Sequence, residues 1–201
     1  MALTAQKESS MSITHLANNI YMKLLVISCS LNPQSKSRIL GRSAFETLKA
    51  QSHSVEWMDL QDYEIPHCDG GDAYGHPHVE ILQKKLAEAD GVLIACPVYN
   101  YSISSTAKNI IELGSSAWTG KVIGIAVASG GSLSYLAPLS LANSLMTDFR
   151  CVIIPRFVFA PGEAVTDDGS IADKGIIDRL DDLTKDLASY TQALRGITEK
   201  H

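Results

Sequence analysis

A segment rich in hydroxyl and amide side chains lies between a short apolar run, residues 23–28, and a helical pattern, residues 39–48. Free backbone N–H groups and the positive end of the helix dipole favour an anion at such a position. Arg38 places a cation in the first helical turn, where it opposes the dipole unless an anion lies nearby. We therefore predict a phosphate site made by Ser30, Asn32, Ser35, Ser37 and Arg38. The alternative is an N-cap serine that follows a solvated loop.

Two tyrosines and several small polar residues follow a second apolar run, residues 91–96. A tyrosine ring offers its face to a planar heterocycle, and backbone N–H groups in an irregular loop can point at ring acceptors. The segment is also compatible with a tight strand-to-helix turn that leaves its tyrosines exposed. The candidate ring-binding residues are Pro97, Val98, Tyr99, Asn100, Tyr101 and Ser102.

A third candidate loop follows the apolar run 122–128 and contains two successive glycines. Glycine lets the backbone approach a ligand closely, although a Gly-Gly pair alone usually marks a turn. Three such loops at one edge are stronger evidence than any one of them. The candidate residues here are Ser129, Gly130, Gly131 and Ser132.

Strand and helix patterns alternate five times, which predicts right-handed βαβ crossovers around a parallel sheet. The strands are expected at 23–28, 55–60, 91–96, 122–128 and 151–154, with Pro97 ending the third. The helices are expected at 39–48, 79–89, 105–113, 134–148 and 171–194, with Gly114 as a C-cap. We predict a three-layer flavodoxin-like α/β fold with a five-stranded parallel sheet in the order 2-1-3-4-5 and helices on both faces. The ligand crevice then lies at the carboxyl ends of the strands.

The composition indicates one globular domain whose partners are small molecules or proteins. The chain has 201 residues, 45% of them hydrophobic, a formal net charge of -5 and a pI near 5.6. These values give no electrostatic footprint for nucleic acid, and no apolar run approaches the roughly 20 residues that span a bilayer. We expect a loosely ordered extension over 1–21, which fails as a signal peptide, and a domain over 22–196.

The cysteines and histidines do not form a recognised metal or disulfide pattern. Cys29, Cys68, Cys96 and Cys151 lie far apart without a C-x-x-C pair, which favours reduced thiols in a cytoplasmic protein. Residues 67–78 contain three histidines, but their glycines and proline indicate a solvated connection rather than a zinc site. The spacing from Gly114 to Lys121 does not fit a P-loop. We predict no metal ligand.

Three segments together resemble the NAD(P)H-dependent FMN reductase family. They are residues 30–38, 97–100 and 59–66, and the resemblance covers the chain from Met22 to the last helical pattern. It implies that 30–38 holds the FMN phosphate, 97–102 contacts the isoalloxazine and 129–132 closes on its pyrimidine end. It also implies a homodimer or homotetramer. The chain departs from the family at Cys29, where glycine is usual.

The resemblance implies an oxidoreductase that passes hydride from NAD(P)H to bound FMN and on to a small acceptor. The candidate acceptors are free flavin, quinones, azo compounds and metal oxyanions. The flavin itself accepts and passes on the hydride, so no side chain is assigned an acid or base role. Two alternatives remain: a flavodoxin-type electron carrier without turnover of its own, and a domain that has lost flavin and serves only in assembly.

Overall fold

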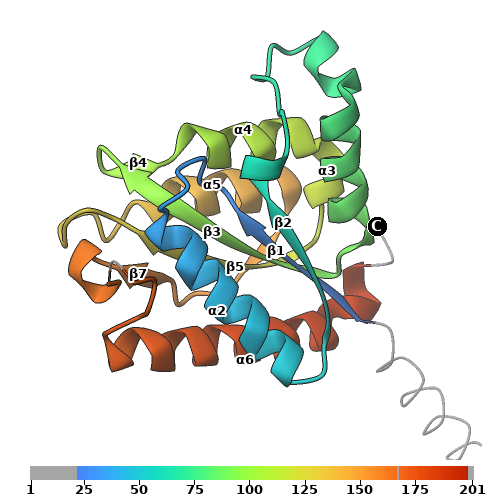
Figure 1. Ribbon diagram of the computed structural model, residues 1–201. Coiled ribbons are helices and arrows are strands. Elements are labelled where there is room, and N and C mark those ends of the chain that lie inside the picture. The colour runs from blue at the N-terminus through green and yellow to red at the C-terminus, as the bar shows by residue number, and fades with distance from the viewer. Residues whose placement is uncertain (1–21, 167, 199–201) are drawn as a thin grey trace, which may run out of the picture.

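One sheet of seven strands runs through the molecule, and helices cover both of its faces (Figure 1). The computed structural model describes residues 22–166 and 168–198. The strands are β1 Lys23–Ser28, β2 Ser54–Asp59, β3 Gly91–Tyr99, β4 Ser102–Ile103, β5 Val122–Ala128, β6 Val152–Ile153 and β7 Val158–Ala160. The α-helices are α2 Lys36–Ala50, α3 Pro77–Glu88, α4 Ser105–Gly114, α5 Pro138–Phe149 and α6 Lys174–Thr198.

The strand order places a topological switch point between β1 and β3. The main path of the sheet is β2-β1-β3-β5-β6, and all of these neighbours are parallel. The chain leaves β1 for β2 on one side and returns to β3 on the other. In such sheets the ligand crevice opens outside the carboxyl ends of the strands at this point. The flavodoxin-like α/β class predicted from the sequence is confirmed.

Each central strand is buried on both faces, which explains its nearly continuous apolar sequence. Leu24 and Val26 of β1 belong to a core cluster that includes side chains of α2 and α6. Leu25 and Ile27 belong to the opposite cluster, with side chains of α3, α4 and α5. The two faces of the sheet are thereby closed, and its carboxyl edge remains for a ligand.

The third strand is longer than predicted, because Pro97 does not end it. β3 continues to Tyr99, and Pro97 pairs with Ala128 of β5. The pairing of β3 with β1 ends at Ala95, so Pro97 lies beyond the residues that need an N–H on that side. The Pro97 carbonyl instead accepts a hydrogen bond from Ser104 N at 3.0 Å.

The prediction of five strands is also wrong in number. The expected fifth strand, 151–154, is divided into β6 and β7, which pair with different parts of β5. Pro155 lies between them and has no N–H to continue the ladder. The additional strand β4 is an antiparallel hairpin partner of β3. The order 2-1-3-4-5 otherwise describes the path, with β5 as its fourth strand and β6 as its fifth.

Helix ends differ from the prediction where local packing decides them. Gly114 is not a left-handed C-cap, because it remains helical and Ser115 takes the positive φ of 48°. Gly114 is required for another reason: a Cβ there would lie 2.3 Å from Trp118 Nε1. α5 begins at Pro138 rather than at residue 134, with the proline in its first turn, where no N–H is needed.

The predicted N-terminal extension, residues 1–21, lies outside the described residues, so the domain bounds 22–196 remain a prediction. Within the described residues, no helix combines the length and the apolar character needed to span a bilayer.

Candidate functional site

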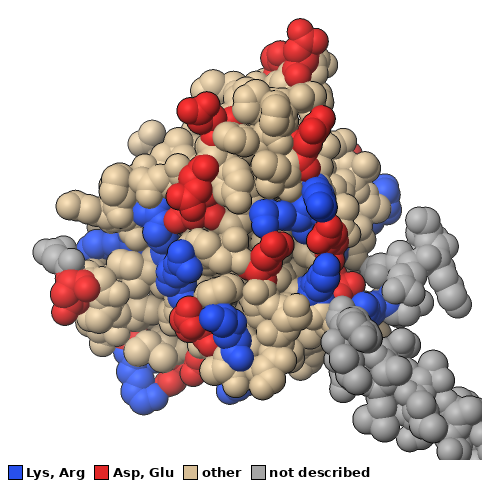
Figure 2. Space-filling model, turned by 45° about the vertical axis from the view of Figure 1, so that its right-hand side comes forward, with Lys and Arg blue, Asp and Glu red and all other residues tan. Residues whose placement is uncertain are grey.

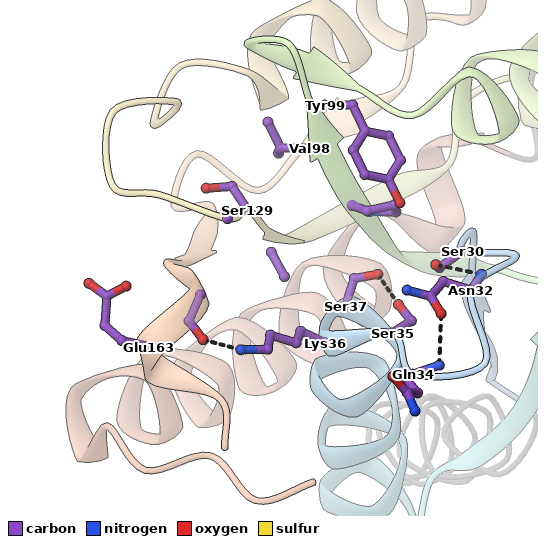
Figure 3. Close-up of a pocket in the computed structure, with 14 residues that line it drawn as sticks. Ser30, Asn32, Gln34, Ser35, Lys36, Ser37, Val98, Tyr99, Ser129 and Glu163 are labelled. Atoms are coloured by element: carbon purple, nitrogen blue, oxygen red, sulfur yellow. Dashed lines mark hydrogen bonds between the residues drawn. The ribbon is translucent and has the colours of Figure 1, made fainter. Parts of the chain in front are cut away.

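A cavity of about 490 Å³ opens at the carboxyl ends of β1, β3 and β5. This volume is in the range of sites for small molecules and cofactors. The lining residues are Ser30, Asn32, Gln34, Ser35, Lys36, Ser37, Pro97, Val98, Tyr99, Ala128, Ser129, Gly130, Gly162 and Glu163. Figure 3 shows them arranged around one space, from the start of α2 to the end of β3. All three loops predicted from the sequence therefore contribute to a single site.

The first turn of α2 presents hydroxyl groups to one end of the cavity. Ser35 is the N-cap, and its Oγ accepts a hydrogen bond from Arg38 N at 3.2 Å. The Oγ atoms of Ser35 and Ser37 lie 2.9 Å apart, and both side chains are buried. The first turn contains no acidic residue. Unpaired N–H groups, hydroxyl donors and the helix dipole together favour an anion here.

The loop before α2 is held in shape by its own polar side chains. Asn32 N donates to Ser30 Oγ at 3.2 Å, and Gln34 N donates to Asn32 Oδ1 at 3.0 Å (Figure 3). Ser30 is only 2% exposed although it belongs to a loop. These contacts fix the turn before a ligand binds, which lowers the entropy cost of binding.

Arg38, the fifth residue predicted for the phosphate site, does not line the cavity. Its guanidinium donates to both carboxylate oxygens of Asp59, at 2.5 and 3.3 Å. It also donates to the carbonyls of Ser30, Asn32 and Pro33 at 2.7, 2.6 and 3.2 Å. A guanidinium has five N–H donors, and these five contacts use them. The structure therefore places Arg38 as the internal support of the loop.

The second predicted loop is a tight hairpin between β3 and β4. Asn100 and Tyr101 both take positive φ, 50° and 63°, as a two-residue type I′ turn requires. Pro97, Val98 and Tyr99 line the cavity. Asn100, Tyr101 and Ser102 project beyond it and are exposed, Tyr101 by 67%.

The third predicted loop contributes Ser129 and Gly130 to the lining, whereas Gly131 and Ser132 lie outside it. A Cβ at Gly130 or Gly131 would meet no protein atom within 4 Å, and neither residue has a positive φ. Chain packing and backbone conformation therefore do not require glycine at either position. At Gly130, which lines the cavity, the missing side chain leaves room for a ligand.

Sequence reasoning missed five lining residues: Gln34, Lys36, Ala128, Gly162 and Glu163. Gly162 and Glu163 belong to η4, a 3-10 helix over Gly162–Ala164 that follows β7. The sequence contains a signal for this loop, because a Pro-Gly pair follows an apolar run there as well. The prediction ended the fifth strand at residue 154, before this run, because it did not expect the strand to be divided. Lys36 lies within the predicted loop, but the cation predicted for the phosphate was Arg38.

A family model described as NADPH-dependent FMN reductase matches residues 22–166. The chain belongs to this family. It is 25% identical over 185 residues to an NADPH:quinone oxidoreductase of Arabidopsis thaliana, covering 87% of this chain and 94% of the relative. It is 27% identical over 181 residues to an NAD(P)H-dependent FAD/FMN reductase of Geobacillus thermodenitrificans, covering 87% and 96%.

Solved structures agree on the fold of this reductase. The flavoenzyme NAD(P)H:(acceptor) oxidoreductase of Paracoccus denitrificans superposes with a TM-score of 0.69 at 23% identity, covering 86% of this chain and 98% of that one. A flavodoxin from the domain Archaea superposes with a TM-score of 0.58 at 12% identity, covering 85% and 99%. These likenesses establish the flavodoxin-like architecture and do not distinguish reductase from carrier.

The residues of the cavity fit the family's cofactor, FMN. One end presents the hydroxyls and unpaired N–H groups that a phosphate needs. The other end is bounded by Val98, Tyr99 and the open position of Gly130, which leave space for a flat ring. The family membership makes this chain an oxidoreductase that uses FMN and NAD(P)H.

The cysteines nearest this edge are not suited to thiolate chemistry. Burial raises the pKa of the Cys96 thiol to about 12. Burial, with smaller effects of Cys96 and Asp59, raises the pKa of Cys29 well above its usual value. Both thiols therefore stay protonated at neutral pH, and the departure from glycine at Cys29 adds a buried apolar side chain. No cluster among residues 22–166 and 168–198 has three His, Cys, Asp or Glu side chains placed to hold a metal ion.

Proposed function

We propose that this protein oxidises NAD(P)H and reduces a small acceptor, such as free flavin, a quinone, an azo compound or a metal oxyanion, with FMN in the cavity at the switch point. The observation that carries the proposal is one continuous cavity with a hydroxyl-lined helix N-terminus at one end and an unfilled glycine loop at the other. A two-electron balance holds, because NAD(P)H loses a hydride and a quinone gains that hydride and one proton.

The chain's own residues bind and orient, and none is assigned a proton-transfer role. Ser30, Asn32, Ser35 and Ser37 are proposed to hold the phosphate. Pro97, Val98, Tyr99, Ser129 and Gly130 are proposed to surround the ring, with Asn100, Tyr101, Ser102, Gly131 and Ser132 at its rim. FMN supplies the hydride-accepting chemistry when it is bound. Hydride transfer requires close stacking of the two rings, and the empty space beside Gly130 and Gly131 leaves one side of the site open for a nicotinamide.

The names of the relatives support quinones and flavins as acceptors for those proteins. The carrier alternative is not favoured by charge, because such carriers are strongly acidic for docking and this chain has a net charge of only -5. Figure 2 shows acidic side chains alone at the top of one face, and basic and acidic side chains interspersed over the rest of it.

Anaerobic mixing tests enzyme against carrier. The protein is loaded with FMN, mixed separately with NADPH and NADH, and followed at the visible flavin absorbance band. We expect bleaching within seconds with at least one nucleotide and full recovery when a quinone is added. A flavin that stays oxidised with both nucleotides contradicts the reductase proposal. The ratio of the two bleaching rates gives the nucleotide preference.

The homodimer or homotetramer that the family resemblance implies is also proposed, and its contact surface does not lie on α4. The apolar residues of α4 are consumed by the chain's own core, since Ala107, Ile110, Ile111 and Leu113 are all buried. Instead, residues 122–147 contain no Lys, Arg, Asp or Glu. Within this stretch the loop before α5 and the outer face of α5 expose large apolar side chains: Leu133, Tyr135, Leu136, Leu139 and Met146. Exposed apolar groups of this size mark interaction sites.

A further inference from the structure

Lys36 is the one cation among the residues that line the cavity, and Glu163 is the one anion. Lys36 is half-buried at the first position of α2. Its side chain extends from α2 toward η4, and Figure 3 shows the Glu163 carboxylate pointing away from it. None of the salt bridges among the described residues includes Lys36.

The position of Lys36 is electrostatically unfavourable for the chain alone. A cation in the first turn of a helix opposes the helix dipole. Arg38, two residues further on, is compensated by Asp59. Among residues 22–166 and 168–198, Lys36 has no carboxylate partner, and the first turn contains no acidic residue that would offset its charge. An anionic ligand in the cavity would interact favourably with both the positive end of the helix dipole and the Lys36 ammonium.

The ammonium of Lys36 also links two walls of the cavity. Lys36 Nζ donates to the Gly162 carbonyl at 2.5 Å, which uses one of its three N–H donors. Gly162 in turn approaches the third loop closely, since a Cβ on it would lie 3.0 Å from Gly130 O. A single side chain therefore connects the start of α2 with η4, and η4 contacts the glycine loop at the other end of the cavity.

We propose that Lys36 is the charge partner of the cofactor phosphate and that the same ammonium ties this phosphate to the η4 segment, Gly162–Ala164. Two of its N–H groups remain for phosphate oxygens while the third holds Gly162 O. Phosphate binding then orders η4, and through η4 it supports the glycine loop beside the ring. Lysine suits this role because its compact charge can donate in several directions, whereas the planar guanidinium of Arg38 is committed to its own loop.

The inference rests on FMN being the cofactor, and its test separates the two ideas. Wild type, Lys36→Met, Lys36→Arg and Lys49→Met are titrated with FMN and with riboflavin, which lacks the phosphate. Lys49 provides the matched control, because it lies in the last turn of the same helix, away from the cavity. Lys36→Met keeps the length and apolar stem of the side chain and removes only its charge.

We expect Lys36→Met to raise the dissociation constant for FMN by about tenfold to a hundredfold, the range for a lost charge-assisted hydrogen bond. Riboflavin affinity should change by less than about threefold. Lys36→Arg should retain most of the preference for FMN, because a guanidinium also donates charge-assisted hydrogen bonds to a phosphate. Lys49→Met should match wild type for both ligands.

Hydrogen exchange of the peptide that contains Ala164 tests the link to η4. Ala164 N donates to Pro161 O at 3.0 Å, so its exchange reports the opening of η4. Saturating FMN should slow this exchange in wild type, and the slowing should be lost or strongly reduced in Lys36→Met.

Three results would overturn the inference at different levels. A wild type that binds FMN and riboflavin equally removes the phosphate site and with it the proposed function. A wild type that prefers FMN, with Lys36→Met keeping the full preference, removes only the role of Lys36 as charge partner. Equal slowing of Ala164 exchange in both proteins removes only the link to η4. If Lys36→Met does not fold, Lys36→Arg decides, since loss of its FMN preference contradicts a role based on charge.

Discussion

The two loops that bound the cavity are built in opposite ways. The loop after β1, residues 29–38, is held by side-chain hydrogen bonds within itself and by the Arg38 guanidinium, and its serines are buried. The loop after β5, residues 129–137, has few such contacts: Ser129 Oγ donates to Gly131 O, and Ala137 N donates to Ser134 O at 3.0 Å. Most of its residues from Gly130 to Leu136 are exposed.

Because of this difference, one end of the cavity suits tight binding of a ligand and the other end suits the entry of different ligands. A preformed loop binds its ligand without an ordering cost, so the phosphate end can select one chemical group strongly. A loop with few contacts and no side chain at two positions can admit ligands of several shapes. The cavity thus joins a rigid end to a more open, permissive end, which suits the proposed function, in which a cofactor stays bound and substrates exchange.

Removing the support of the rigid loop should have the largest effect. Arg38→Met leaves the carboxylate of Asp59 without its cation, and the two side chains are only 15% and 8% exposed. Breaking a buried ion pair from one side typically costs about 3 to 5 kcal/mol of the free energy of unfolding. Urea denaturation of Arg38→Met beside wild type measures this loss.

Lys174→Met is the control for the Arg38 experiment, because its ion pair with Asp178 is exposed to solvent and should contribute little to the free energy of unfolding. The double variant Arg38→Met, Asp59→Leu should recover part of the loss, since no buried charge then remains unpaired. If Arg38→Met is no less stable than Lys174→Met, the loop does not depend on this pair.

A change in the permissive loop should reduce ligand binding and leave the fold intact. Gly130→Val adds a Cβ that meets no protein atom within 4 Å apart from its chain neighbours, so the free energy of unfolding should change by less than about 0.5 kcal/mol. The added methyl groups should weaken FMN and riboflavin alike, by about tenfold, because they occupy space proposed for the ring. Titration with both ligands, combined with thermal unfolding, measures the two effects.

Gly75→Val is the matched control for Gly130→Val. A Cβ at Gly75 also meets nothing within 4 Å, and the φ of Gly75 is not positive, so a side chain there is not strained. Gly75, however, does not line the cavity. Unchanged flavin binding in Gly130→Val would show that its missing side chain serves no ligand. A loss for FMN alone would place the phosphate, rather than the ring, beside this loop.

The sequence predicted which residues reach this edge better than it predicted what they do there. The continuous apolar runs of β1 and β5 identified buried parallel strands, because only burial on both faces requires such a pattern. The partner of Arg38 was not predictable in the same way. Asp59 is 21 residues away and reaches the loop only because β2 lies beside β1.

Longer-range contacts were still less accessible from sequence. Lys36 and Gly162 are 126 residues apart, and their contact depends on the division of the last strand into β6 and β7 at Pro155. A proline in a run of apolar residues can end a strand, as here, or be tolerated, as Pro97 is in β3. Which of the two occurs depends on whether a neighbouring strand needs the missing N–H, and this is a property of the assembled sheet.

The smallest expected effect on the site comes from the uncharged surface of the permissive loop and α5. Leu136 is 67% exposed there, and a symmetric dimer would bring this surface against its own copy. A surface without charges suits such a contact, because no charge then faces a like charge. Leu136→Glu introduces that repulsion and should reduce the mass seen by light scattering at micromolar concentration toward that of the monomer.

The control is Ile81→Glu, which adds the same charge at another exposed apolar position, on α3. It should leave the oligomer unchanged. If neither substitution disturbs the core, the free energy of unfolding of each variant's monomer should lie within about 0.5 kcal/mol of that of the wild-type monomer. A wild type that is monomeric under these conditions contradicts the proposed assembly.

If Leu136→Glu dissociates the oligomer but FMN titration is unaffected, the cavity of one chain binds the cofactor by itself. If FMN binding falls as well, the permissive loop depends on its neighbour, and the contrast between the two loops extends to the assembly: one is supported from within the chain and the other from outside it.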